Sequence, residues 1–144
     1  MTATGGCLCG GVRYAVNGEM RKVHACHCSQ CRRWSGNFVA TADCRSADLR
    51  FEAADTLVWF ASSQAAERGF CRRCGSALFW RRTAPATEWT SIAAGSIDPP
   101  TGLRTARHIF VADKSDFYEI ADGLPQHAVH ADATTAACAK GWKL

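Results

Sequence analysis

Large apolar residues alternate with polar ones in short stretches along most of the chain, and Gly, Pro and Asn separate the stretches. A period of two residues is typical of strands that bury one face. Strands are therefore predicted over residues 12–16, 22–25, 37–42, 49–52, 56–60, 77–82, 89–97 and 108–111. Residues 29–34 fit one helical turn, and residues 64–69 resemble a polar turn. The pattern predicts a mainly β domain of about seven to ten short strands, without a long amphipathic helix.

This pattern fades after residue 128, which suggests where the domain ends. Residues 1–130 are predicted to form one domain, and residues 131–144 a C-terminal tail that is either loosely helical or flexible. No run approaches the ~18 apolar residues of a membrane span. The N-terminal residues also lack the basic and apolar parts of a secretory signal. We therefore expect a soluble cytoplasmic protein with no membrane partner.

The cysteine content changes this picture of an ordinary β domain. The chain has nine cysteines, an odd number, and in a reducing compartment these are better explained as metal ligands and free thiols than as disulfides. Seven of them gather in three short clusters: Cys7 and Cys9, then Cys26, Cys28 and Cys31, then Cys71 and Cys74. Such a concentration of soft donors predicts metal binding.

Coordination chemistry suggests how seven thiols divide between two zinc ions. A closed structural site prefers four thiolates from two short knuckles, which fits Cys7, Cys9, Cys71 and Cys74. The remaining three, Cys26, Cys28 and Cys31, would leave a fourth position for water or substrate. They are the candidate catalytic zinc site, so two Zn²⁺ per chain are expected.

Metal binding also removes the apparent case for an acidic partner. The formal net charge of +4 counts every cysteine as neutral. Seven thiolates and two divalent ions would lower it to about +1. Charge therefore offers no support for a nucleic-acid partner.

Two other interpretations of the cysteines remain open. All seven could hold purely structural metal in a domain that serves as a protein-interaction module. Alternatively, Cys71 and Cys74 could be a redox dithiol, although the βαβ context of that chemistry is missing. A three-thiol set without a fourth ligand favours an enzyme over a module.

The three clusters and their glycines resemble one known family. Residues 6–14 (GCLCGGVRY), 26–33 (CHCSQCRR) and 69–76 (GFCRRCGS) are similar, in this order, to motifs of the glutathione-dependent formaldehyde-activating family, which includes centromere-protein-V-like proteins. Residues 94–98 and 108–111 resemble two further segments, so the similarity runs from about residue 5 to about residue 127. The chain departs at Phe117 and Tyr118, where the family often has tryptophan, and at His127.

This resemblance implies a fold, a ligand division and an activity. The fold is Mss4-like, a β-tent of antiparallel sheets pinned by zinc. The implied ligand division is the same as the one argued above. The activity that named the family joins formaldehyde to glutathione, giving S-hydroxymethylglutathione, and is classed as carbon–sulfur lyase chemistry. A small thiol or thiol adduct such as that of glutathione is the implied partner, although most members are not known to act on it.

Three residues beside the central cluster are candidate substrate contacts. Arg32 and Arg33 could pair with a carboxylate, but they could equally be solvated charges or counter-charges to the thiolates. His27 could be a ligand or a proton shuttle, or an imidazole packed beside the motif. The oligomeric state is not predicted.

Overall fold

The computed structural model describes residues 2–130 and is mainly β. Its strands are β1 (Ala3–Gly6), β2 (Arg13–Val16), β3 (Val23–Cys26), β4 (Val39–Arg45), β5 (Leu49–Ala53), β6 (Leu57–Ala61), β7 (Ala66–Cys71), β8 (Ala77–Thr83), β9 (Ala86–Ala93) and β10 (Thr105–Ile109). The α-helix in the described residues is α1 (Ser29–Ser35), and three single 3₁₀ turns are η1 (Ser46–Asp48), η2 (Ala94–Ser96) and η3 (Val111–Asp113).

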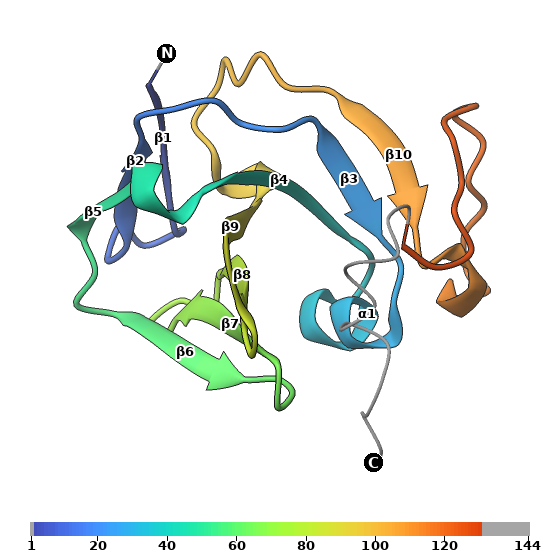
Figure 1. Ribbon diagram of the computed structural model, residues 1–144, viewed down its shortest axis with the longest axis horizontal. Helices are drawn as coiled ribbons and strands as arrows, with labels where there is room; N and C mark the ends of the chain where they lie inside the picture. Colours follow the sequence, from blue (N-terminus) through green and yellow to red (C-terminus); the bar gives the residue numbers. More distant parts are fainter. Residues whose placement is uncertain (1, 131–144) are drawn as a thin grey trace.

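The strands form two sheets, which Figure 1 shows side by side. The smaller sheet has the order β1-β2-β5 and is antiparallel. The larger has the order β10-β3-β4-β9-β8-β7-β6, and its pairs are antiparallel except for β10 with β3, which run parallel. Residues 94–104 carry the chain from β9 past β4 and β3, so β10 adds to the edge in the same direction as β3. The predicted mainly β fold is confirmed, with a mixed larger sheet.

The core fills the space where the two sheets meet. Its largest fully buried side chains are Tyr14 from the smaller sheet and Leu78 and Ile92 from the larger one. A separate buried group packs beside α1 and consists of Cys26, Cys28, Cys31, Ile109 and Phe110. The apolar alternation read from the sequence thus supplies one core, and the central cysteines form part of another.

One predicted turn is a strand. Residues 64–69 were expected to be a polar turn, but Ala66–Cys71 form β7, which pairs with β6 on one side and β8 on the other. Glu67 pairs with Arg81 of β8, whereas Arg68 is buried. Two neighbouring strands satisfy the backbone of β7, so polar side chains do not prevent it from entering the sheet.

Three predicted strands also differ in their bounds. The strand expected at residues 37–42 is Val39–Arg45. The strand expected at residues 89–97 begins earlier, at Ala86, and gives way to η2 after Ala93. The strand expected at residues 108–111 ends at Ile109, because Phe110 adopts the left-handed conformation with φ 54°. Positive φ is uncommon for a residue with a bulky side chain and ends the extended backbone there.

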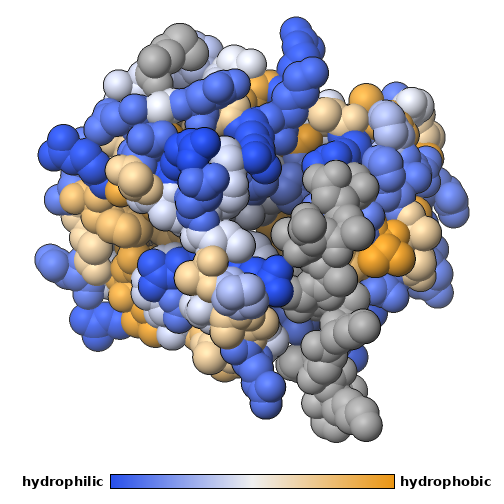
Figure 2. All heavy atoms as spheres, in the orientation of Figure 1, coloured by the Kyte–Doolittle hydropathy of each residue, from blue (hydrophilic) through white to orange (hydrophobic). Residues whose placement is uncertain are grey.

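The surface shows no broad apolar face in the view of Figure 2, where hydrophobic residues lie in small groups between hydrophilic ones. Large hydrophobic side chains that are exposed in the described residues come from scattered positions: Leu8, Phe51, Phe60, Phe117 and Val129. Single exposed apolar residues are normal on the surface of a folded domain.

Candidate metal centres and the adjoining cavity

The structure joins two of the three sequence clusters into one group of four thiols, called the first cluster from here on, and leaves Cys26, Cys28 and Cys31 as the second cluster. Cys7 and Cys9 follow β1, while Cys71 ends β7 and Cys74 lies in the next turn. Their four sulfur atoms all lie within 4.8 Å of one another. The Gly75 N–H donates to the Cys71 carbonyl at 2.8 Å, and Gly75 has φ +75°, a conformation that glycine adopts without strain. The structure therefore builds the four-thiol site from two tight knuckles.

The sulfur spacing in this cluster fits a tetrahedral metal. Cys7 and Cys9 sulfur atoms are 3.6 Å apart, and those of Cys9 and Cys71 are 3.7 Å apart. A tetrahedral zinc with Zn–S bonds of about 2.3 Å would place its sulfur ligands about 3.8 Å apart. The four thiols are thus arranged as one coordination shell.

Neutral donors contact the sulfur atoms of Cys71 and Cys74 and favour the thiolate form of both. The Ser76 hydroxyl lies 3.2 Å from the Cys74 sulfur, and hydrogen bonding from Ser76 lowers the pKa of Cys74 to about 5. The Thr56 hydroxyl, 3.1 Å from the Cys71 sulfur, is the main cause of a lowered pKa at Cys71. Because the thiolate is the form that binds metal, both contacts prepare the cluster for a cation.

The second cluster is built by the end of β3 and the start of α1. Cys26 is the last residue of β3, Cys28 caps α1 by accepting a hydrogen bond from the Cys31 N–H at 3.3 Å, and Cys31 lies in the first helical turn. All three are buried, with their sulfur atoms within 4.8 Å of one another. Hydrogen bonds with Cys28 and Cys31 raise the pKa of Cys26 well above its usual value. Such a trio ionises fully only beside a cation.

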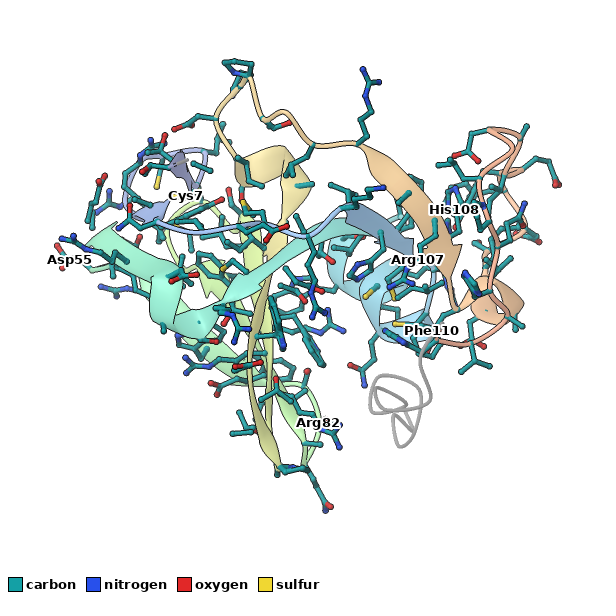
Figure 3. All side chains as sticks on the ribbon, turned by 45° about the horizontal axis from the view of Figure 1, so that its top comes forward. Cys7, Asp55, Arg82, Arg107, His108 and Phe110 are labelled. Atoms are coloured by element: carbon teal, nitrogen blue, oxygen red, sulfur yellow. The ribbon has the colours of Figure 1, made fainter. Side chains whose placement is uncertain are left out.

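The two clusters are separate sites. Figure 3 places Cys7 near one end of the molecule and Phe110, which packs against the second cluster, near the other. Within the described residues, they are the groups of three or more His, Cys, Asp or Glu side chains that could hold a metal. The structure brings together all seven predicted thiols in the predicted division, and each set could bind a metal.

A cavity of about 410 Å³ opens onto the second cluster. Cys26 and Cys31 form part of its wall, and Cys28 is not among the lining residues. Aromatic rings from α1, β8 and β9 line it, namely Trp34, Phe79, Trp80 and Trp89. Its volume lies in the range that holds small molecules, about 300–1,000 Å³. The three-thiol site therefore faces a space into which a ligand fits.

Four arginines line the same cavity: Arg21, Arg68, Arg82 and Arg107. Asp43 is the acidic residue in the lining, and the Ser91 hydroxyl donates to it at 2.6 Å. The Arg21 guanidinium lies over the Trp89 ring, 3.6 Å from its centre. The lining thus carries net positive charge, which favours an anionic ligand.

Arg32 and Arg33, the arginines singled out in the sequence, lie on α1 outside this lining. Arg33 is exposed, and Arg32 is half-buried. The lining arginines come from β7, β8, β10 and the segment before β3. They are far apart in the sequence, and only the fold shows that they line one cavity. Arg68 in particular lies in the stretch that was expected to be a turn, so the sequence did not mark it as a cavity residue.

His27 belongs to a partly buried network of side chains that do not line this cavity. Its Nδ1 is hydrogen-bonded to the Tyr118 hydroxyl, and its Nε2 lies 2.8 Å from His108 Nδ1. His108 Nε2 in turn lies 2.8 Å from the Asp122 carboxylate. Burial is the main cause that lowers the pKa of His27, to about 4, so the ring is neutral near pH 7.

This network lies against a second cavity, of about 350 Å³, lined by His27, Phe38, His108, Tyr118 and Asp122 among others. His27 is absent from the lining of the larger cavity. The network joins the central motif to the segment after β10, which Figure 1 shows beside that strand. No short sequence motif links Tyr118 and Asp122 to His27, which explains why only the structure identifies them.

Cys44 is fully buried in the main core, and Cys138 lies outside the described residues. No helix in the described part of the chain is long and apolar enough to cross a membrane.

Comparisons with known proteins agree with this geometry. The chain is 28% identical over 118 residues to an uncharacterized lyase of Schizosaccharomyces pombe, a match that covers 82% of this chain and 85% of the relative. A crystal structure of a Rhodobacter sphaeroides protein superposes with a TM-score of 0.57 at 28% identity, covering 69% of this chain and 91% of that one. Residues 2–113, which include both cysteine clusters, match the family described as glutathione-dependent formaldehyde-activating enzyme. The chain therefore belongs to the glutathione-dependent formaldehyde-activating enzyme family.

Proposed function

We propose that this chain binds zinc at both cysteine clusters and catalyses carbon–sulfur lyase chemistry on a thiol adduct of formaldehyde, with glutathione as the thiol. Cys7, Cys9, Cys71 and Cys74 would hold a structural ion. The reaction would take place at Cys26, Cys28 and Cys31. The observation that carries the proposal is the cavity of about 410 Å³ that reaches Cys26 and Cys31. A purely structural site has no need of such access.

The charge of the cavity supports a thiol that bears carboxylates. Glutathione is such a molecule, and Arg21 and Arg107 in the lining offer guanidinium groups that bind a carboxylate through two parallel hydrogen bonds. Trp34 and Phe110 also line the cavity, and Phe110 packs against the second cluster. These apolar side chains would limit the access of water to the thiols. Arg32, Arg33 and His27 remain proposed substrate contacts, although none of the three lines the cavity of about 410 Å³.

The chemistry needs no oxidant or reductant. In the forward direction the thiol sulfur bonds to the carbonyl carbon of formaldehyde, the π pair moves onto oxygen, and oxygen takes the proton that the thiol released. In reverse the carbon–sulfur bond breaks and formaldehyde leaves. Zinc bound by three thiolates would supply Lewis acidity that stabilises negative charge on sulfur or oxygen. The residues of the chain would hold the ion, orient the carboxylates of the bound thiol and exclude water.

An NMR exchange experiment tests this proposal. Formaldehyde and glutathione are mixed with a catalytic amount of zinc-loaded protein, and the rates of adduct formation and breakdown are compared with the uncatalysed rates. We expect both to rise, because a catalyst accelerates both directions equally. If neither rate changes, the proposed reaction is wrong.

Two cysteine variants provide a matched comparison. Cys28→Ser removes a proposed ligand, so we expect the acceleration to fall by about 10²-fold or more, as with other groups that stabilise developing charge. The zinc content should drop from about two to about one per chain. Cys44→Ser changes a thiol in the main core outside both clusters and should leave the zinc content unchanged. A Cys28→Ser protein with full activity would contradict the assignment of the site.

A further inference from the structure

Arg68 connects the strand that ends in the first cluster with the thiols of the second. It lies on β7, three positions before Cys71, and only 4% of it is exposed. Its Nη1 and Nη2 each donate to the Cys31 sulfur at 3.7 Å, and Nη2 also donates to Gln30 Oε1 at 3.2 Å. A buried guanidinium is costly unless a negative group lies beside it. The Cys31 sulfur lies beside the guanidinium and would carry negative charge as a metal ligand.

The two clusters differ in the donors that contact their sulfur atoms. In the first, these are neutral: the Val12 N–H lies 3.2 Å from Cys7, and hydroxyl groups lie beside Cys71 and Cys74. In the second, Cys31 receives hydrogen bonds from a cation. Three thiolates and one divalent ion carry a formal charge of −1, which a single guanidinium cancels. The buried second site with Arg68 is thus formally neutral.

We propose that Arg68 is a positioning residue of the second cluster, which fixes the Cys31 sulfur through two hydrogen bonds and neutralises the site when a divalent metal is bound. A hydrogen bond from a cation also withdraws electron density from sulfur, so the metal keeps more of its Lewis acidity. This inference rests on the zinc site of the proposed function but not on its substrate. It extends the assignment of ligands to a residue outside the cysteine motifs.

Zinc affinity measured by competition with a colorimetric chelator tests the role of the charge. In Arg68→Gln we expect one of the two zinc ions to bind about 10–100-fold more weakly, the range seen when partners of metal ligands are removed, and the other to bind as in the wild type. Arg68→Lys retains the buried charge and should recover most of the affinity. Arg81→Gln removes an arginine of the neighbouring strand that pairs with Glu67, and should change neither affinity.

Cobalt substitution gives a readout that a purely structural role would not alter. Cys31 donates electron density to bound Co²⁺, and the sulfur-to-cobalt charge-transfer band reports the energy of the sulfur electrons. Loss of the Arg68 hydrogen bonds should raise that energy, so the band of Arg68→Gln should move to longer wavelength. Arg68→Lys should show a smaller shift, and it serves as the test variant if Arg68→Gln does not fold.

Several results would overturn the inference. Unchanged zinc affinity and an unchanged cobalt spectrum in Arg68→Gln would do so, as would equal losses in Arg68→Lys and Arg68→Gln, since shape rather than charge would then matter. A protein that binds two zinc ions with these Arg68 effects but lacks activity on formaldehyde and glutathione would leave the inference intact and remove only the proposed substrate.

Discussion

Gly75 shows how one backbone angle supports a metal knuckle. It follows Cys74, has φ +75°, and a Cβ added there would meet nothing within 4 Å. The cost of Gly75→Ala is therefore conformational rather than steric, and we expect a loss of about 1–2 kcal/mol in unfolding free energy. Urea unfolding of the zinc-loaded protein measures this loss.

Gly95 is a matched control for that substitution. A Cβ at Gly95 would also meet nothing within 4 Å, but this glycine lies in η2 and is not among those with positive φ. Gly95→Ala should therefore cost little or nothing. Equal losses at both positions would show that the left-handed angle is not the cause.

A partly buried hydroxyl pair joins β2 of the smaller sheet to η2, which follows β9 of the larger one. The Tyr14 and Ser96 hydroxyl oxygens lie 2.7 Å apart, and Ser96 Oγ also donates to the Ala93 carbonyl at 2.7 Å. Burial is the main cause that raises the pKa of Tyr14 to about 12, so its hydroxyl keeps its proton at neutral pH. We expect Tyr14→Phe to lower the unfolding free energy by about 0.5–1.5 kcal/mol.

A double-mutant cycle with Ser96→Ala separates this contact from others. Ser96→Ala also loses the bond to Ala93, so the single variants are not equivalent, and the coupling energy is the informative quantity. Chemical denaturation of the four proteins in the cycle should give a favourable coupling free energy of about the size expected for Tyr14→Phe alone. Additive effects of the two substitutions would mean that the pair does not join the sheets energetically.

The two proposed zinc sites should contribute differently to the stability of the whole molecule. The first cluster ties Cys7 and Cys9 to Cys71 and Cys74, so it closes a long loop between the two sheets. The second uses three ligands within six residues and constrains the chain only locally. Structural zinc contributes about 10–16 kcal/mol of apparent free energy in small peptides at neutral pH, so its removal from the first cluster should unfold the protein.

Stepwise chelation at neutral pH, followed by circular dichroism and zinc analysis, tests this difference. The first zinc should leave with little spectral change, because a three-thiol shell binds less tightly and holds no distant segments together. Loss of the second should coincide with cooperative unfolding. Unfolding that accompanies the first zinc, or survival of the fold without either, would contradict the assigned roles.

Local patterns in the sequence were sufficient for most strands and for the division of the thiols. Alternation located β2, β3, β5, β6 and β8 to within a residue or two, because half-buried strands impose that pattern on their own side chains. The spacing of Cys26, Cys28 and Cys31 indicated a metal site because this feature is also local. Three donors within six residues reach one ion through local backbone turns alone.

Only the tertiary structure decided which distant residues surround those thiols. Arg68 is polar and lies in a stretch that looks like a turn, yet pairing with β6 and β8 makes it part of a strand and buries it against Cys31. His108 contacts His27 because β10 pairs with β3, and residues 110–130 fold back beside β10, which brings Tyr118 to His27 and Asp122 to His108. These contacts depend on the order of the strands in the sheet and on the segment that folds back after β10. Neither can be deduced from the spacing of residues along the chain.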